Sequence, residues 1–132
     1  MQKVLLIAAA GSLGALLRYF LGAGIHHFAG HDFPWGTFIV NIMGCFLFGA
    51  ALAMLDNGWF LSPETRVIVL TGFLGSFTTF STYIFESGQM MREAQWLFAA
   101  GNLSLQILIG LAAIFAGQAI MRHAYTLLAA TG

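Results

Sequence analysis

Four apolar stretches, each long enough to cross a lipid bilayer as a helix, fill most of the 132-residue sequence. Because about 20 apolar residues span the hydrocarbon core, we predict membrane helices at residues 4–25, 35–55, 67–90 and 96–121. The connecting segments are short, so the expected fold is a single four-helix transmembrane domain over residues 1–132, with both termini on one side of the membrane. Tryptophans, whose amphipathic rings favour the headgroup level, fall at or near the predicted ends: Trp35, Trp59 and Trp96.

The composition agrees with an all-α membrane protein surrounded by lipid. Hydrophobic residues make up 59% of the chain and charged residues 8%, whereas an average soluble domain has about 25% charged residues. The formal net charge is zero and the basic residues are not clustered, so no nucleic-acid partner is expected. The first span is too long for the apolar region of a cleavable signal peptide, and we expect it to stay in the protein. Cys45 lies in an apolar span and is expected to be a small buried hydrophobe.

The Lys/Arg bias that sets the orientation of membrane proteins is weak in this chain. Lys3, Arg66 and Arg122 fall on the side of the termini, and Arg92 falls on the opposite side. A chain with so small a bias can insert both ways, and two oppositely inserted copies can form an antiparallel dual-topology homodimer. Four helices enclose little space, which also favours an oligomer. A single orientation with the termini inside the cell is the alternative that the count leaves open.

Small and polar residues share one face of three predicted helices, following the period of 3.6 residues. In the first span this face comprises Ala8, Gly11, Ala15, Arg18 and Gly22. In the second span it comprises Thr37, Asn41, Gly44 and Phe48. In the fourth span it comprises Asn102, Gln106, Gly110, Ala113 and Gly117, with Ser104 off the face. Small residues let helices approach closely, so these faces are expected to point into the bundle.

The polar side chains inside the spans need partners. Arg18 is expected either to face the bundle interior or a water-filled vestibule, or to extend to the interface as a long side chain near the span end. The amide of Asn41 offers two donors and an acceptor, and it serves either to join helices or to line a pore. The same two interpretations hold for the ladder of Asn102 and Gln106.

The third span contains the least typical membrane sequence, GFLGSFTTFSTY at residues 72–83. Hydroxyls gain nothing from acyl chains and glycines weaken a helix, so the segment is expected to face inward and to be broken. Non-helical backbone at membrane depth needs protein or a water-filled cavity to satisfy its polar groups. Beyond the glycines, Thr79, Tyr83 and Glu86 share a helix face, and Phe80 and Tyr83 are neighbours at i and i+3.

The residues of the common catalytic sites are missing from the sequence. There is no HExxH motif, no Cys/His cluster, no serine with a placed histidine and no pair of membrane carboxylates. The residues that metal-dependent, nucleophilic or proton-coupled reactions need are therefore absent from the sequence, and we do not expect an enzyme. His26, His27 and His31 form a loop cluster, which is a weak signal for a metal site because it lacks cysteine or carboxylate ligands.

Three segments, in order and each in its own span, resemble the fluoride channel family, Fluc, also called CrcB. They are GSLGALLRY at 11–19, GTFIVNIMGCFLFG at 36–49 and GFLGSFTTFSTY at 72–83. The resemblance covers essentially the whole chain. It implies an antiparallel dual-topology homodimer in the bacterial inner membrane, with two fluoride pores lined by both subunits. The implied role is to lower cytoplasmic fluoride.

The resemblance also implies roles for individual residues. Asn41 matches the pore asparagine, and Phe80 matches the first of two phenylalanines whose ring edges line the ion path; the second is Tyr83 here. Gly75 and Thr78 match the helix break, expected over residues 72–78, whose carbonyls coordinate a structural sodium ion on the dimer axis. The remaining pore or vestibule positions are Arg18, Thr37, Ser81, Thr82 and Glu86. The polar residue of the fourth span is assigned to Asn102, Ser104 or Gln106.

These residue types suit a small, strongly hydrated anion. A fluoride pore has to replace water with donors along the path, and neutral amides, hydroxyls and aromatic edges can do so without trapping the ion. The alternative is a small dual-topology multidrug exporter, which needs a carboxylate in the first span, and this first span has none. A structural subunit of a larger membrane complex, with glycines and amides for packing alone, is a third class.

Overall fold

The computed structural model describes residues 1–30, 32–58 and 62–131 of the chain. His31 and Trp59, which the sequence analysis singled out, lie outside this part. Within it, regular structure is entirely helical. The elements are α1 (Gln2–Ala29), α2 (Trp35–Asp56), α3 (Pro63–Arg66), η1 (Val67–Leu74), α4 (Gly75–Phe77), α5 (Phe80–Arg92) and α6 (Trp96–Thr131).

Four helical segments are long and apolar enough to cross a membrane, as the hydropathy pattern predicted: Gln2–Ala29, Trp35–Asp56, Pro63–Arg92 and Trp96–Ala130. The elements α3, η1, α4 and α5 together form the third of them. Trp35 and Trp96 stand at the first positions of α2 and α6, as expected. The fourth helix continues about ten residues past its predicted end at Met121, because Arg122 and His123 do not interrupt a helix.

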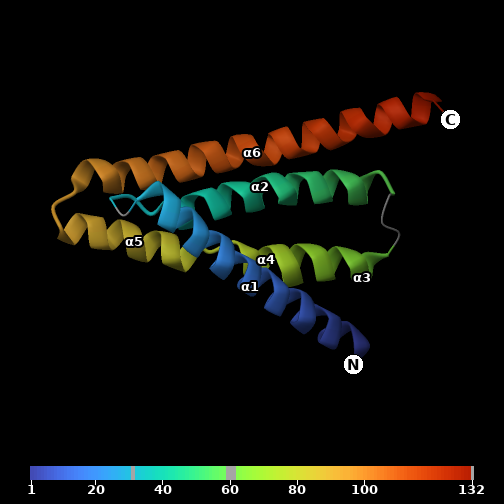
Figure 1. Ribbon diagram of the computed structural model, residues 1–132. Coiled ribbons are helices and arrows are strands. Elements are labelled where there is room, and N and C mark those ends of the chain that lie inside the picture. The colour runs from blue at the N-terminus through green and yellow to red at the C-terminus, as the bar shows by residue number, and fades with distance from the viewer. Residues whose placement is uncertain (31, 59–61, 132) are drawn as a thin grey trace.

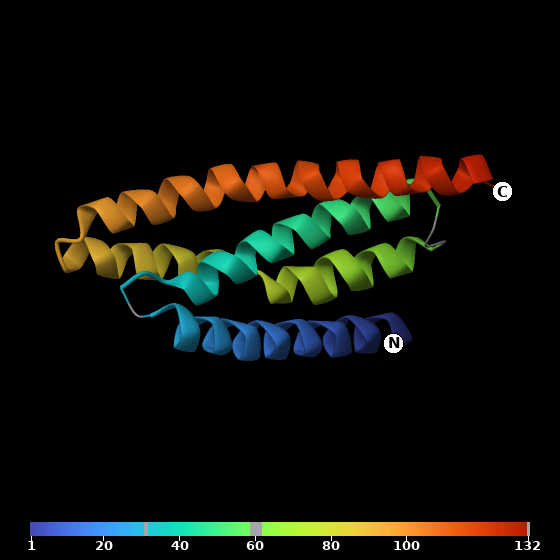
Figure 2. The same cartoon turned by 45° about the horizontal axis from the view of Figure 1, so that its top comes forward.

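The spans run back and forth, so both termini lie at the same end of the molecule (Figure 1). This confirms the arrangement expected from an even number of spans. In both views α2 lies alongside α6, and the rotated view places α1 and α6 on opposite sides of the molecule (Figure 2). The main contacts of α1 are with η1, α2 and α4, while α5 packs against α6.

Glycines bring the backbones of neighbouring helices into contact. A Cβ on Gly49 would overlap the backbone of Ile114, and a Cβ on Gly117 would overlap the carbonyl of Phe46, so α2 and α6 touch without intervening side chains. In the same way Gly14 of α1 lies against the carbonyl of Phe73 in η1. Close backbone approach is how membrane helices gain packing energy in lipid.

The third span is broken near its middle, at Thr78 and Thr79. Both residues have extended backbone, with φ −85° and ψ 158° at Thr78 and φ −146° and ψ 118° at Thr79. The break is shorter than expected from the sequence, which placed it over residues 72–78, because Gly72 and Gly75 remain helical. In η1 the turns are wider than in an α-helix, and the N–H of Gly75 donates to Leu70 O five residues back.

Candidate functional site

The break in the third span is held by one side chain from α2. The amide of Asn41 makes two bonds to the backbone of Thr79: Thr79 N–H donates to Asn41 Oδ1 at 2.8 Å, and Asn41 Nδ2 donates to Thr79 O at 3.0 Å. A neighbouring glycine, Gly44, leaves room for Thr78, whose methyl group would overlap a Cβ there. Asn41 of α2 therefore satisfies the Thr79 N–H, which the break leaves without a partner in either half of the span.

The break also releases carbonyl groups of α4. In a continuous helix Thr79 N–H would donate to Gly75 O, but it donates to Asn41 instead, which leaves Gly75 O free of that bond. The next carbonyl, Ser76 O, accepts from Nε of Arg18 at 3.2 Å. Thr78 Oγ1 donates to Leu74 O at 3.0 Å. The half-buried Arg18 thus points from α1 to the end of the first half of the third span.

A buried chain of hydrogen bonds continues from Asn41 into α6 and back to α5. Asn41 Nδ2 donates to Gln106 Oε1, and Gln106 Nε2 donates to Asn102 Oδ1 at 3.0 Å. Asn102 Nδ2 donates to Ser87 Oγ at 2.9 Å, and Ser87 Oγ donates to Tyr83 O at 2.8 Å. The predicted inward face of the fourth span is confirmed, because Asn102 and Gln106 are buried.

Of two serines near the hydrogen-bonded chain, Ser104 was a predicted candidate and Ser87 was not. Ser104, one of three candidates for the polar track of the fourth span, is exposed, and its hydroxyl donates to Ala100 O at 2.6 Å in its own helix. Ser87, which the sequence analysis did not single out, is buried and joins the amide chain. Its position four residues after Tyr83, on the same helix face, is the signal that would have found it.

A groove of about 350 Å³, here called the central groove, opens beside Asn41. Phe80, Tyr83 and Gln106 line it together with Asn41. The rings of Phe80 and Tyr83 are neighbours, with centroids 5.7 Å apart, as their spacing predicted. Phe80 is 75% exposed, whereas Tyr83 is buried. The Tyr83 hydroxyl donates to Leu103 O of α6 at 2.7 Å, so the group that distinguishes tyrosine from phenylalanine is bonded to a helix carbonyl.

A smaller cavity of about 150 Å³, the connecting cavity, lies between α1, α2 and α5. It shares Thr79 with the central groove, and Arg18, Thr37 and Thr82 also line it. The hydroxyls of Thr79 and Thr82 lie 2.9 Å apart, and Thr82 N–H donates to Thr79 Oγ1, which caps the start of α5. Ser81 is exposed and lies outside both cavities.

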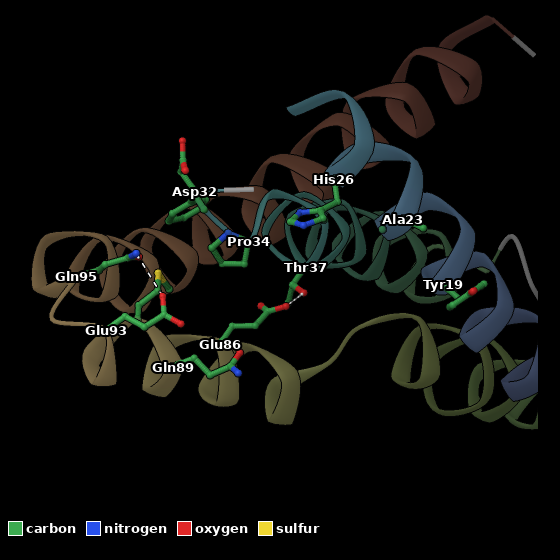
Figure 3. A pocket seen from close by; sticks show the side chains of 14 residues that line it. Tyr19, Ala23, His26, Asp32, Pro34, Thr37, Glu86, Gln89, Glu93 and Gln95 are labelled. Atoms are coloured by element: carbon green, nitrogen blue, oxygen red, sulfur yellow. Dashed lines mark hydrogen bonds between the residues drawn. The ribbon is translucent and has the colours of Figure 1, made fainter. Parts of the chain in front are cut away.

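A cavity of about 580 Å³, here called the entrance cavity, lies at the end where α1 meets α2 (Figure 3). It shares Thr37 with the connecting cavity. Thr37 Oγ1 donates to Glu86 Oε1 at 2.7 Å. The other carboxylate oxygen, Glu86 Oε2, is buried and has no hydrogen-bond partner among the described residues. Further acidic side chains line the cavity at Asp32 and Glu93.

The structure thus brings most of the candidate residues together around Thr79. Among the described residues, no group of three histidine, cysteine or acidic side chains is placed to bind a metal ion. His26 and His27 were expected in a loop but lie in the last turn of α1, and they gain no support as metal ligands. The pore roles assigned to the other residues stay predictions. The arrangement can present neutral N–H and O–H donors and aromatic edges to an anion along the edge of α5.

Comparison with known proteins gives a consistent result. Residues 5–118 match the model of the family described as "CrcB-like protein, Camphor Resistance (CrcB)". A protein of Solidesulfovibrio magneticus named fluoride-specific ion channel FluC is 47% identical over 122 residues, which cover 92% of this chain and 98% of that protein. A protein of the same name from Nitrosococcus oceani is 47% identical over 119 residues, covering 90% of this chain and 95% of its own.

Proposed function

Because this chain belongs to the CrcB-like protein family, we propose that it is an ion channel that conducts fluoride passively across a membrane. The relatives with the name fluoride-specific ion channel align over nearly their whole length, so the similarity is not confined to one part of those chains. As a member of a channel family the chain is a transport protein and not an enzyme. The expected site is the bacterial inner membrane, where a channel would release fluoride from the cytoplasm.

The observation that carries this proposal is the central groove. It combines the amide of Asn41 with the ring edges of Phe80 and Tyr83 at membrane depth, next to the break in the third span. Aromatic edges and amide N–H groups carry positive partial charge without a net charge. Such groups can replace the hydration shell of fluoride and still release the ion, which conduction requires.

The groove is half of a pore in this proposal, and a second copy of the chain completes it. Phe80 is 75% exposed in the single chain although it sits near the middle of a membrane span. A groove wall that is open on one side needs a partner surface before it can enclose an ion. The weak Lys/Arg bias supports an antiparallel arrangement of the two copies, and two-fold symmetry then gives two equivalent pores.

A structural sodium ion on the dimer axis is part of the same proposal. The donor set fits, because sodium prefers oxygen ligands and the break frees the carbonyl of Gly75. Gly75 is exposed in the single chain, so its carbonyl is open to a site shared between copies. Thr78 lies directly before the second half of the span and would offer its backbone carbonyl. The cation would add positive field near the anion path.

The decisive experiment is fluoride efflux from liposomes that contain the purified protein, with chloride efflux as the control. Rapid fluoride efflux with little chloride efflux is the expected result. No fluoride flux, or equal chloride flux, would contradict the proposal of a fluoride channel. The alternative, a dual-topology multidrug-type exporter, predicts proton-coupled drug transport instead. It lacks support because the first span contains neither aspartate nor glutamate.

Two substitutions test the placement of the pore. Asn41→Asp retains the acceptor for Thr79 N–H but adds a negative charge and removes the N–H donors, so we expect loss of fluoride flux by about 100-fold or more. Phe80→Ile removes the ring edge and should lower flux by about 10-fold or more. Each variant is compared with the wild type as a folded dimer. If both conduct normally, the pore does not pass along Asn41 and Phe80.

A further inference from the structure

The chain of hydrogen bonds between Asn41 and Tyr83 O runs in one direction, and its ends fix that direction. At one end Thr79 N–H can only donate, so Asn41 must present Oδ1 to it and turn Nδ2 away. At the other end Tyr83 O can only accept, so Ser87 Oγ must donate to it and accept from Asn102. The amide orientations between these ends follow from backbone groups that cannot rotate.

Both N–H groups of Asn41 are used within the protein. One donates to Thr79 O, and the other donates to Gln106 Oε1. Gln106 lines the central groove together with Asn41. An anion in the groove can therefore bind the Asn41 amide only by taking an N–H from one of these two acceptors. Thr79 O is backbone beside the break, whereas Gln106 Oε1 is on a side chain that can rotate.

We propose that Gln106 is a positioning residue for permeation. Its Oε1 accepts one N–H of Asn41 until the permeating ion displaces it. When the ion leaves, Gln106 Oε1 accepts that N–H again. This inference rests on the proposed fluoride channel function. Competition at one N–H keeps the ion from binding too tightly to leave, which a conducting site needs. Fluoride and Gln106 Oε1 then alternate at the same donor.

The rest of the chain keeps Gln106 in this role. Gln106 Nε2 is held by Asn102 Oδ1, and Asn102 is fully buried and held in turn by Ser87. A released Gln106 therefore returns with Oε1 toward Asn41, because the opposite orientation would set its Nε2 against an N–H donor. Bonds that run in one direction polarise one another and reinforce this arrangement.

The test is the fluoride dependence of the current in Gln106→Met, which has a side chain of similar length without the amide. The freed N–H of Asn41 should hold fluoride longer. One hydrogen bond corresponds to a factor of about three to ten, so the half-saturating fluoride concentration should fall by that factor. The maximal current should fall in parallel, because slower release governs both. Ser104→Ala is the control, since that exposed hydroxyl bonds only within α6.

A second variant, Ser87→Ala, removes the far end of the chain with little change in volume and should lower the half-saturating concentration in the same direction but less. A purely structural role would instead lower the unfolding temperature or the active fraction and leave half-saturation unchanged. If the wild type conducts fluoride but the half-saturating fluoride concentration of Gln106→Met is unchanged or higher, the inference is wrong. If Gln106→Met does not fold, the same result in Ser87→Ala overturns it. Absence of fluoride current from the wild type overturns the proposed function as well.

Discussion

The two halves of the third span are held in place by different kinds of contact. Before the break, η1 and α4 lie against α1 through backbone contact, where Gly14 leaves no room for a side chain beside Phe73. After the break, α5 is joined to α2 and α6 by side-chain hydrogen bonds, mainly from Asn41 and Asn102. Close backbone packing holds the first half in place, and side-chain hydrogen bonds hold the second half.

This difference determines which half can handle an ion. Packed backbones have no donors to spare and cannot exchange partners, so the first half serves as a rigid support. The side-chain donors of α2 that lie beside the second half are bonded to acceptors that an anion can replace, such as Gln106 Oε1 for Asn41 and Glu86 Oε1 for Thr37. A channel needs both properties, with the support directly adjacent to the exchangeable donors.

The largest expected effect comes from adding a methyl group to α1 where it contacts the first half. In Gly14→Ala the new Cβ meets the Phe73 carbonyl and also lies 3.1 Å from the Phe77 amide nitrogen, so the helices must separate. We expect a loss of stability of about 1–3 kcal/mol or failure to fold, measured by thermal unfolding of the purified protein in detergent.

The matched control is Gly24→Ala on the same helix, where nothing lies within 4 Å of the new Cβ. It should keep wild-type stability and flux. Because alanine favours a helix more than glycine does, equal losses in both variants would mean that the dimer contact, not the α1–η1 contact, decides the result. The claim that backbone contact with α1 holds the first half in place would then be wrong.

Arg18 tests the boundary between the two halves, since it joins α1 to the last turn before the break. Arg18→Met leaves Ser76 O without this donor, and we expect a loss of about 1 kcal/mol together with a several-fold lower fluoride flux. Arg18→Lys retains the charge but not the planar guanidinium. If flux needs only the positive charge at the connecting cavity, Lys restores it; if the carbonyl bond matters, Lys behaves like Met.

The sequence predicted the spans and their inward faces better than the position of the break between the two halves. Hydropathy and the spacing of small residues are local signals, and they located four spans and the inward faces of α2 and α6. The break was predicted over residues 72–78, which includes Thr78 but also Gly72 and Gly75, and those two glycines remain helical; glycine weakens a helix locally without having to end it. The actual position of the break at Thr78 and Thr79 depends on Asn41, which is 38 positions from Thr79 in the sequence. Long-range partners of this kind leave no periodic trace.

A smaller effect is expected from the hydroxyl of Tyr83 than from its ring. Tyr83→Phe removes the bond to Leu103 O, a carbonyl inside α6 that still accepts from its own helix, so we expect a cost of about 0.5–1.5 kcal/mol. Fluoride flux should stay within about three-fold of the wild type, because the ring edge at the groove is retained.

Tyr83→Leu is the matched comparison, since it removes both the hydroxyl and the ring. Flux should fall by about 10-fold or more, as in Phe80→Ile. Efflux from liposomes measures both variants under the same conditions. A Tyr83→Phe channel as impaired as Tyr83→Leu would place the hydroxyl in the ion path, and the bond to Leu103 would then be exchangeable like those of Asn41.

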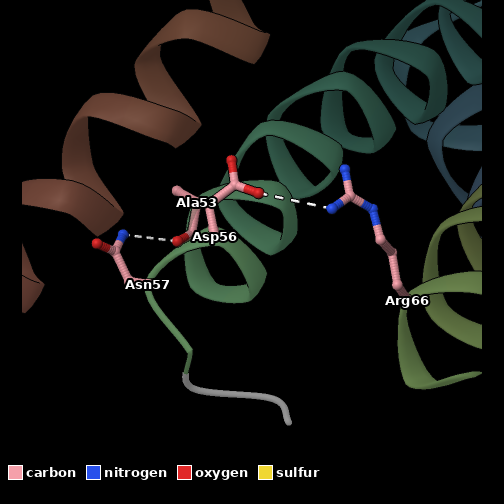
Figure 4. A network of polar contacts seen from close by, with 4 residues as sticks. All are labelled: Ala53, Asp56, Asn57 and Arg66. Atoms are coloured by element: carbon pink, nitrogen blue, oxygen red, sulfur yellow. Dashed lines mark hydrogen bonds and ion pairs between the residues drawn. The ribbon is translucent and has the colours of Figure 1, made fainter. Parts of the chain in front are cut away.

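The smallest effect is expected at the start of the first half, outside the contacts that fix either half. Arg66 of α3 pairs with Asp56 at the end of α2 at 3.6 Å, and both side chains are about half exposed (Figure 4). Exposed pairs contribute about 0–1 kcal/mol, so Arg66→Gln should shift the unfolding temperature by no more than about 2–4 °C and leave flux unchanged. If Arg66→Gln lowers stability as much as Gly14→Ala, the link between α2 and α3, and not the glycine contact with α1, positions the packed half. The wild type in high salt supplies an independent check, because screening weakens an exposed pair and leaves backbone packing unaffected.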